Sequence, residues 1–241
     1  MSMKRLDRLL SELGVATRSE LRTIIKSGRV SVDGLVVTAP EQRVDGETSV
    51  IALDGAVLCC QRCRYFMMDK PAGVLSVTED RKQETVLDLL PPELQRLGLF
   101  PVGRLDKDTS GLLLLTNDGD FAHRVISPKS GVEKRYLAVV DGVPNEDDVR
   151  AFAEGVTLGD GTKCLPAKLE LLGEGRCFVT VMEGKYHQVK RMLASRGKPV
   201  TALRRLCVGA LTLDPETQPG ALRELDENDL CKVLKGFRIG I

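Results

Sequence analysis

A loop of charged residues runs directly into four consecutive leucines in residues 101–116, PVGRLDKDTSGLLLLT. Arg104, Asp106 and Asp108 suit an open surface, whereas the leucines at 112–115 predict a buried strand. A charged loop that is held by a buried strand is a common way to aim a carboxylate into a pocket. Asp106 is therefore the first candidate for a chemical role.

Two later stretches carry side chains that could work with this carboxylate. Tyr136 begins a strand in EKRYLAVV, after two cations. In VTVMEGKYHQVKRML a strand, a glycine turn and a helix follow one another, and His187, Lys190 and Arg191 share a helical face at i, i+3 and i+4. One carboxylate, one tyrosine and one lysine at the edges of these elements could meet in one cleft, although each alone is equally typical of an ordinary surface.

Several common chemistries lack their usual motifs. Neither G-x-x-x-x-G-K-[ST] nor a G-x-G-x-x-G on a strand–helix turn is present, so nucleotide hydrolysis and dinucleotide redox chemistry lose their usual sites. The two histidines are isolated, and a Ser-His-Asp triad is not expected. Cys60 and Cys63 form a C-x-x-C without a second pair, which favours a flexible reduced linker over a structural zinc site. We expect no metal.

Composition sets the class of protein. The chain has 241 residues and a net charge of only +1, so any nucleic-acid surface must come from local segregation of charge. No apolar run approaches the roughly 18 residues of a membrane span. The first residues, MSMKRLDRLLSEL, are too charged for a signal peptide. We expect a soluble cytoplasmic protein that does not contact a membrane.

The first part of the chain predicts two helices and a hairpin. Four leucines at 6, 9, 10 and 13 recur at helical spacing. Thr17 and Glu20 have the spacing of a capping box at the start of a second helix, and Gly28 closes that helix. The run RVSVDGLVV then indicates a hairpin around its Asp-Gly pair.

The second helix is expected to carry a basic stripe. Arg18, Arg22, Lys26 and Arg29 fall at i, i+4, i+8 and i+11, on the side away from the apolar face. Most charged stripes are solvated faces, but those normally mix signs, and only Glu20 interrupts this one. A phosphate backbone is the natural partner of such a row.

From residue 65 the chain alternates strands and helices. The expected strands lie in RYFMMDK, GLLLLT, KRYLAVV, AKLELL, RCFVTVME and LRRLCVGALTL, and the expected helices in NEDDVRAFAEG and YHQVKRMLASRG. Asp120 and Asp226 are expected to cap two further helices. The connections are too varied for a doubly wound fold, so the expected class is α+β, with a mixed, mainly antiparallel sheet and flanking helices. The expected domains are residues 1–58 and 65–241, joined by a linker at 59–64.

Three of these stretches resemble one enzyme family. GRLDKDTSGLLLLTNDG is similar to the catalytic motif of pseudouridine synthases of the RsuA/RluA kind, and DKPAGVLS and EGKYHQVKRM are similar to its flanking motifs in the same order. Residues 3–58 resemble the S4 RNA-binding domain, so the match covers nearly the whole chain. GKYHQVKRM and the C-terminal ALTLD…PGALREL are most similar to the RsuA branch, which acts on small-subunit ribosomal RNA.

The resemblance implies a reaction and roles for the residues. Asp106 is the essential carboxylate, as nucleophile or as base, and Lys190 the cation that keeps it ionised. Tyr136 stacks on the uracil of a flipped-out nucleotide, Arg104 holds a phosphate or fills the vacated space, and Leu105 supplies a dry wall. An isomerisation needs no cofactor. The implied RNA contacts are Lys70, His187, Arg191, Arg18, Arg22, Lys26 and Arg29.

Three functions remain open from the sequence. The first is a synthase, expected to be a monomer, that modifies small-subunit ribosomal RNA at uridine 516 of the 16S molecule. The second is a relative that acts on large-subunit ribosomal RNA. The third is a non-catalytic assembly factor that binds ribosomal RNA with the same fold. Retention of Asp106, Tyr136 and Lys190 argues against the third, because a retired site would have no reason to keep all of them.

Overall fold

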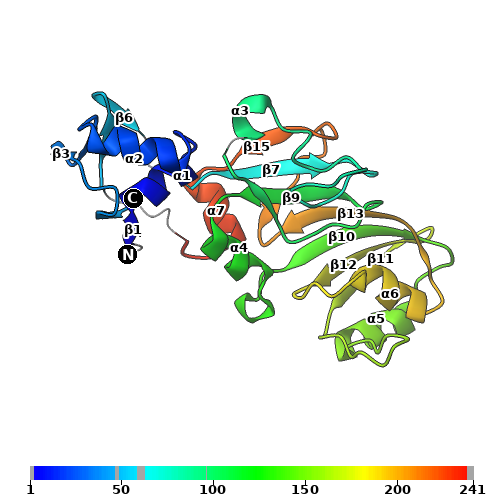
Figure 1. The fold of residues 1–241 in the computed structure, drawn as a ribbon. Coiled ribbons are helices and arrows are strands. Elements are labelled where there is room, and N and C mark those ends of the chain that lie inside the picture. Colours follow the sequence, from blue (N-terminus) through cyan, green and yellow to red (C-terminus); the bar gives the residue numbers. More distant parts are fainter. Residues whose placement is uncertain (1–2, 47–48, 59–62, 96, 238–241) are drawn as a thin grey trace. The chain divides into compact units, whose positions relative to one another are not determined.

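The computed structural model describes residues 3–46, 49–58, 63–95 and 97–237. These residues fall into two units that divide between Cys63 and Arg64 (Figure 1). Most of the expected linker, including Cys60, lies outside the described residues, whereas Arg64 belongs to the second unit through its backbone N–H, which donates to the Asn117 side chain over 2.8 Å. Within the described ranges, no helix is long and apolar enough to cross a membrane.

The first unit packs two helices against short strands. The capping box is confirmed, because Thr17 accepts from the Glu20 N–H and the Glu20 carboxylate accepts from the Thr17 N–H over 2.9 Å. The expected hairpin is also confirmed, with Asp33 and Gly34 both at positive φ, as a two-residue Asp-Gly turn requires. The helices are α1 (Leu6–Glu12) and α2 (Arg18–Lys26). Strand β1 (Met3–Arg5) pairs with β4 (Arg43–Asp45), and a second sheet has the order β3-β2-β5-β6, made of β2 (Val30–Val32), β3 (Leu35–Val37), β5 (Ile51–Leu53) and β6 (Ala56–Leu58).

The second unit is built on one large mixed sheet, so the expected α+β class is confirmed. Its strand order is β11-β12-β10-β13-β9-β7-β15, with β14 beside β13 and β8 beside β9. Strands β9 and β13 run parallel and the other described pairs antiparallel. The strands are β7 (Tyr65–Lys70), β8 (Phe100–Val102), β9 (Ser110–Thr116), β10 (Lys134–Val140), β11 (Lys168–Gly173), β12 (Arg176–Val181), β13 (Val200–Val208), β14 (Leu211–Thr212) and β15 (Leu222–Glu224).

Helices flank this sheet. They are α3 (Pro92–Gln95), α4 (Gly119–Ile126), α5 (Glu146–Glu154), α6 (Gln188–Ser195) and α7 (Glu227–Val233), with a 3₁₀ turn at Pro128–Ser130. Asp226 caps α7 as expected from the sequence, and Asn145 caps α5. The expected cap of α4 is wrong, because Asp118 rather than Asp120 accepts from the Phe121 N–H. Asp120 lies inside the first turn, where a carboxylate still favours the helix dipole.

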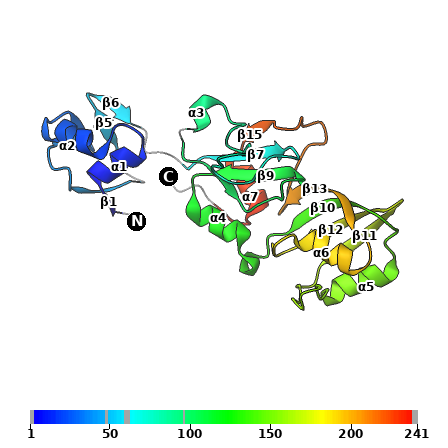
Figure 2. The ribbon, with the colours of Figure 1, turned by 45° about the vertical axis from the view of Figure 1, so that its right-hand side comes forward.

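Two buried clusters anchor the loop before β9 and the start of α6 in the second unit. Val189, Met192 and Leu193 of α6 pack with α5 in one buried cluster on β10, β11 and β12, and Figure 2 shows the two helices side by side along these strands. A separate cluster holds Leu113 and Leu115 of β9 against the β7 side chains Phe66 and Met68. The loop before β9 and the start of α6 are therefore each anchored to a rigid layer.

Candidate active site

The loop that carries Asp106 lies between β8 and β9 and is held by buried contacts. Leu105 is 5% exposed and packs in the same cluster as Leu113 and Leu115. Its backbone N–H donates to the Ser76 hydroxyl oxygen over 3.2 Å, and that hydroxyl donates to the Leu105 carbonyl over 3.0 Å. The position of the neighbouring Asp106 is therefore set by the sheet core rather than by the loop alone.

Lys70 does not contact RNA as the sequence predicts, because its side chain is fully buried at the end of β7. Its ammonium donates to the carbonyl oxygens of Pro71 over 2.9 Å, Lys107 over 3.3 Å and Thr109 over 2.9 Å. Burial lowers the pKa of Lys70 to about 8, against the opposing attraction of Asp108 and Asp106. The side chain holds the backbone of the Asp106 loop from beneath.

The predicted carboxylate and its predicted cation are brought together. Lys190 on α6 places its Nζ 3.1 Å from Asp106 Oδ2 and 2.5 Å from Asp108 Oδ1. His187 Nε2 lies 3.4 Å from the other Asp106 oxygen. One ammonium therefore bridges two carboxylates that stand two residues apart in the same loop.

The charges of this group stabilise one another. Burial disfavours the Lys190 ammonium, but its contacts with Asp108 and Asp106 outweigh that cost, so the pKa of Lys190 is raised above its usual value. The hydrogen bond from Lys190 lowers the pKa of Asp108, in spite of partial burial. The site thus keeps a lysine cation beside its carboxylates throughout the neutral range.

Tyr136 lies on β10, near two buried cations. Arg205 of β13 is 4% exposed; its Nε donates to the Leu112 carbonyl over 2.7 Å and its Nη1 lies 3.5 Å from the Tyr136 hydroxyl. Its Nη2 has no hydrogen-bond partner within the described residues. Lys134 donates to the Val125 carbonyl over 3.1 Å, and burial, together with Arg205, lowers its pKa to about 8. Sequence reasoning missed both cations, because nothing in the pattern of a strand shows which basic residues point inward.

These groups surround one cavity of about 650 Å³. Asp106, Tyr136 and Arg205 line it together with the loop at 183–187, and a smaller pocket of about 70 Å³ adjoins it at Asp106 and Tyr136. Cavities of about 300–1,000 Å³ with a few convergent polar groups are the usual form of a ligand site. Asp106 and Tyr136 therefore line one cleft, and Lys190 is joined to it through its contact with Asp106.

The other residues expected to contact RNA differ in their exposure and in whether they already form an ion pair. Arg104 is exposed on the cavity wall. Arg191 pairs with Asp160 over 2.5 Å, so an RNA would have to compete for it. Tyr186 is 76% exposed on the same wall, and sequence reasoning missed it although the motif GKYHQVKRM contains it.

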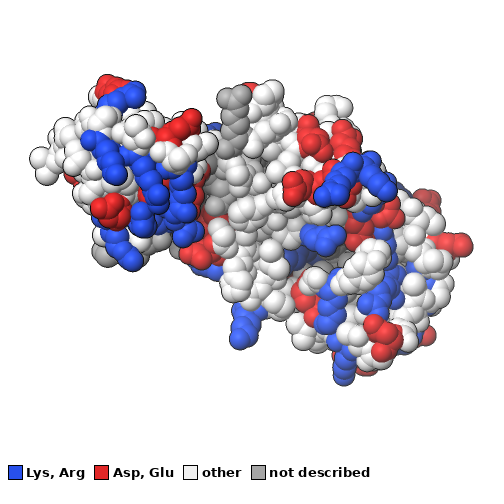
Figure 3. Space-filling model, viewed as in Figure 1, with Lys and Arg blue, Asp and Glu red and all other residues white. Residues whose placement is uncertain are grey.

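The basic stripe is shorter than the sequence predicts. Arg18, Arg22 and Lys26 are exposed on α2, and Figure 3 shows Lys and Arg gathered on one face of this unit, with fewer acidic residues among them. Arg29 lies beyond the end of the helix and pairs with Asp54 over 2.5 Å. Gly28 ends the helix, so counting helical positions past it placed Arg29 wrongly.

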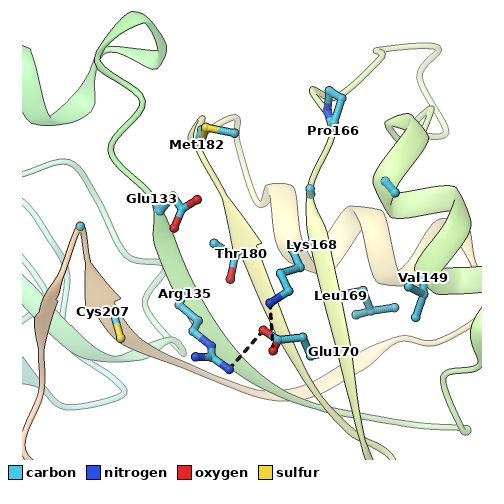
Figure 4. Close-up of a pocket in the computed structure, with 13 residues that line it drawn as sticks. Glu133, Arg135, Val149, Pro166, Lys168, Leu169, Glu170, Thr180, Met182 and Cys207 are labelled. Atoms are coloured by element: carbon cyan, nitrogen blue, oxygen red, sulfur yellow. Dashed lines mark ion pairs between the residues drawn. The ribbon is translucent and has the colours of Figure 1, made fainter.

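A second hollow, of about 680 Å³, lies around the edge strand β11. Neither Asp106 nor Tyr136 lines it. Figure 4 shows Arg135 and Lys168 both turned toward Glu170, each over 3.1 Å. Burial raises the pKa of the Cys207 thiol on its wall, which keeps that sulfur protonated. In the described ranges no group of three or more His, Cys, Asp or Glu is placed to hold a metal ion. The cavity at Asp106 is the better candidate for chemistry.

Comparison with known proteins agrees with this choice. The family model for RNA pseudouridylate synthase matches residues 64–195, and that for the S4 domain matches residues 4–50. An RNA pseudouridine synthase of Bacillus subtilis, YtzG, is 44% identical, covering 94% of this chain and 96% of its own. The ribosomal small subunit pseudouridine synthase A of Escherichia coli is 39% identical over 95% of this chain and 100% of its own. That of Vibrio cholerae is 40% identical over 96% of this chain and 100% of its own.

A solved structure, described as a pseudouridylate synthase, is similar throughout. It superposes with a TM-score of 0.68 at 34% identity, covering 95% of this chain and 99% of the other. The residue range of the family match includes Asp106, Tyr136 and Lys190. This chain belongs to the RNA pseudouridylate synthase family and carries an S4 domain ahead of its synthase domain.

Proposed function

We propose that this chain converts one uridine of small-subunit ribosomal RNA, uridine 516 of the 16S molecule, to pseudouridine, with Asp106 as the essential carboxylate. The observation that carries the assignment is the Asp106–Lys190 pair, 3.1 Å long, at a cavity lined by Tyr136. The choice of RNA is supported by relatives at 39–40% identity that are named as small-subunit enzymes.

The reaction explains why such a site suffices. The N1–C1′ bond of the uridine breaks, the uracil turns, and a C5–C1′ bond forms, while the proton on C5 leaves and N1 gains one. Substrate and product are isomers, so no net oxidation and no external group are involved. Asp106 attacks the sugar as a nucleophile or removes a proton from it, and either role uses the ionised carboxylate that Lys190 faces.

The remaining wall groups fit a detached base. Tyr136 would stack on the uracil once the nucleotide has left its own stack. Breaking the N1–C1′ bond leaves the electron pair on the uracil, and the Arg205 guanidinium, which lines the cavity beside Tyr136, supplies positive charge near a carbonyl oxygen that gains negative charge. Leu105 would supply the dry wall that strengthens these contacts.

The first unit would supply affinity rather than chemistry. Arg18, Arg22 and Lys26 would contact phosphates through the exposed face of α2. Residues 65–241 would then form the catalytic domain and residues 1–58 the RNA-binding domain. We place the working enzyme in the cytoplasm, as a monomer on ribosomal RNA or an assembly intermediate.

The test is to map pseudouridine in ribosomal RNA from cells that have the protein, lack it, or carry Asp106→Asn. We expect one site of the small-subunit RNA to lose pseudouridine in both altered strains. The purified Asp106→Asn protein should bind the RNA within about twofold of the wild type, because the amide keeps the shape of the carboxylate. Loss at a large-subunit site would move the substrate, and turnover by Asp106→Asn or an unchanged map would overturn the assignment.

A further inference from the structure

Tyr186 presents the one exposed Phe or Tyr ring among the described residues. Its side chain is 76% exposed, whereas the rings of the other described Phe and Tyr residues are buried or partly buried. It stands on the wall of the cavity that holds Asp106. A single exposed apolar residue is ordinary on a protein surface, so its meaning depends on whether the ring is held in place.

The ring is held by its neighbour His187. The two rings are stacked, with their centroids 3.8 Å apart and their planes 17° apart. Because His187 covers one face of Tyr186, the other face is left for a ligand. His187 Nε2 in turn lies 3.4 Å from Asp106 Oδ1, so the stack is tied to the predicted catalytic carboxylate.

The backbone beneath the stack is unusual. His187 has φ 48° and ψ 35°, in the left-handed region that residues other than glycine rarely adopt. The other described residues of this kind, Asp33, Asp54 and Glu174, each precede a glycine in a two-residue hairpin turn, whereas His187 does not. Strain of this sort persists where the surroundings enforce it, and it gathers at ligand clamps.

A buried network enforces the conformation. Gln188 donates to the Glu183 carboxylate over 2.7 Å and accepts from the Lys185 N–H over 2.9 Å. The Lys185 ammonium pairs with the same carboxylate, and Glu183 is 6% exposed. The loop that displays Tyr186 is therefore preorganised rather than adaptable.

The surroundings identify the class of ligand. Arg104 is exposed on the same cavity wall and forms no ion pair within the described ranges. A rigid open ring beside free positive charge is the arrangement with which proteins bind unpaired nucleotides. We propose that the open face of Tyr186 stacks on an unpaired base directly next to the target uridine, while Tyr136 holds the target itself.

This inference rests on the proposed function and adds a second base to the site. A nucleotide that leaves its stack leaves its neighbour without a stacking partner on that side. Tyr186 would take that place, so that the neighbour is marked by stacking rather than by its hydrogen-bonding edge. Removal of the ring should raise KM by about tenfold, with the loss in KM rather than in kcat.

The experiment uses the full chain and a ribosomal RNA fragment that contains the mapped uridine. In two versions of the RNA, 2-aminopurine replaces the nucleotide on the 5′ or on the 3′ side, since stacking quenches its fluorescence. In two others that position is abasic. The proteins are the wild type, Tyr186→Ala, and Tyr186→Phe as the matched control that keeps the ring.

We expect quenching at one of the two flanks with the wild type and with Tyr186→Phe, and its loss with Tyr186→Ala. The abasic RNA should cost the wild type the same factor in KM as the Ala substitution, and should cost Tyr186→Ala nothing further. Two results would overturn the inference. One is equal quenching by all three proteins at both flanks. The other is an abasic RNA that raises the KM of Tyr186→Ala by the same factor as the KM of the wild type.

Failure of the proposed function would look different. A wild type that quenches as expected but makes no pseudouridine would contradict the activity while supporting the stacking site. A wild type that makes pseudouridine, with no effect of Tyr186→Ala on quenching or KM, would contradict the stacking site alone.

Discussion

Lys190 bridges two carboxylates that differ in their exposure to solvent. The Asp106 side chain is 25% exposed and that of Asp108 is 76% exposed. Water and salt screen the second contact more strongly than the first. Of the two, the Asp106 contact is therefore the one that an RNA filling the cavity would strengthen, since burial removes the screening water.

At the residue scale, Lys190→Met should lower kcat by about 100-fold, because it leaves a partly buried carboxylate without its cation. Lys190→Arg should restore part of the rate. Asp108→Asn is the matched control, which keeps the Asp106 contact and should stay within about tenfold of the wild type. A kcat that Lys190→Met leaves unchanged, or lowers no more than Asp108→Asn does, would contradict the pairing.

A second prediction concerns the buried Lys70 ammonium. Its pKa of about 8 lies below the usual 10.5, so between these values the unfolded chain binds more protons than the folded one. The burial cost is complete below pH 8 and is relieved as the pH rises toward 10.5, so stability should increase through this window. Relative to Lys70→Met, the wild type should gain on the order of 2 kcal/mol between pH 8 and pH 9.5 in urea unfolding. If the free energy of unfolding changes with pH equally in the wild type and in Lys70→Met, the prediction is contradicted.

Sequence could point to the candidate residues of the site but not to their surroundings. Asp106 and Lys190 stood out through motifs that resemble a family, although 83 residues separate them in the chain. Lys70 was mistaken for a surface contact because β7 is buried on both faces, and such a strand shows no alternation that tells inside from outside. The exposure of Tyr186 and the inward turn of Arg205 depend on tertiary packing, which no local pattern records.

At the scale of elements, the sequence predicted helix starts where a side chain hydrogen-bonds to the backbone of its own helix. The capping box of α2 and the Asp226 cap of α7 were readable because their side chains bond to the backbone of their own helix. The order of strands in the large sheet was not, because β9 and β13 meet although about 90 residues lie between them. Their parallel contact brings Gly111 against Arg205.

That contact makes Gly111 sensitive to the smallest substitution. Its φ is +107°, and a Cβ there would lie 2.2 Å from the Arg205 carbonyl oxygen. Gly111→Ala should destabilise the protein by at least about 3 kcal/mol, through strain and a clash between two central strands. Gly119→Ala is the control, because a Cβ there meets nothing within 4 Å, and it should leave stability unchanged or raise it. Both substitutions are compared with the wild type by thermal unfolding. Equal effects of the two substitutions would contradict the close approach of β9 and β13.

At the scale of the whole molecule, the net charge of +1 conceals a division of labour. Acidic residues balance the basic ones over the chain, yet α2 presents three exposed cations on one short helix. Affinity for a polyanion depends on such local groups and not on the total. The salt dependence of binding should therefore be set largely by the first unit and the chemistry by the second.

Replacing Arg18, Arg22 and Lys26 together by alanine tests this division. Each lost phosphate contact removes one counterion-release term, so the slope of log affinity against log salt should become shallower by about 2–3 units. Alanine favours helices, and Asp7, which Arg22 approaches within 3.6 Å, keeps its 2.8 Å contact with Arg5, so α2 should remain folded. The control replaces Arg150, Lys168 and Arg176, which changes the net charge equally at exposed positions of the second unit. Both proteins are titrated with one ribosomal RNA fragment at several salt concentrations, and if both slopes stay parallel to that of the wild type, the α2 cations are only a solvated face.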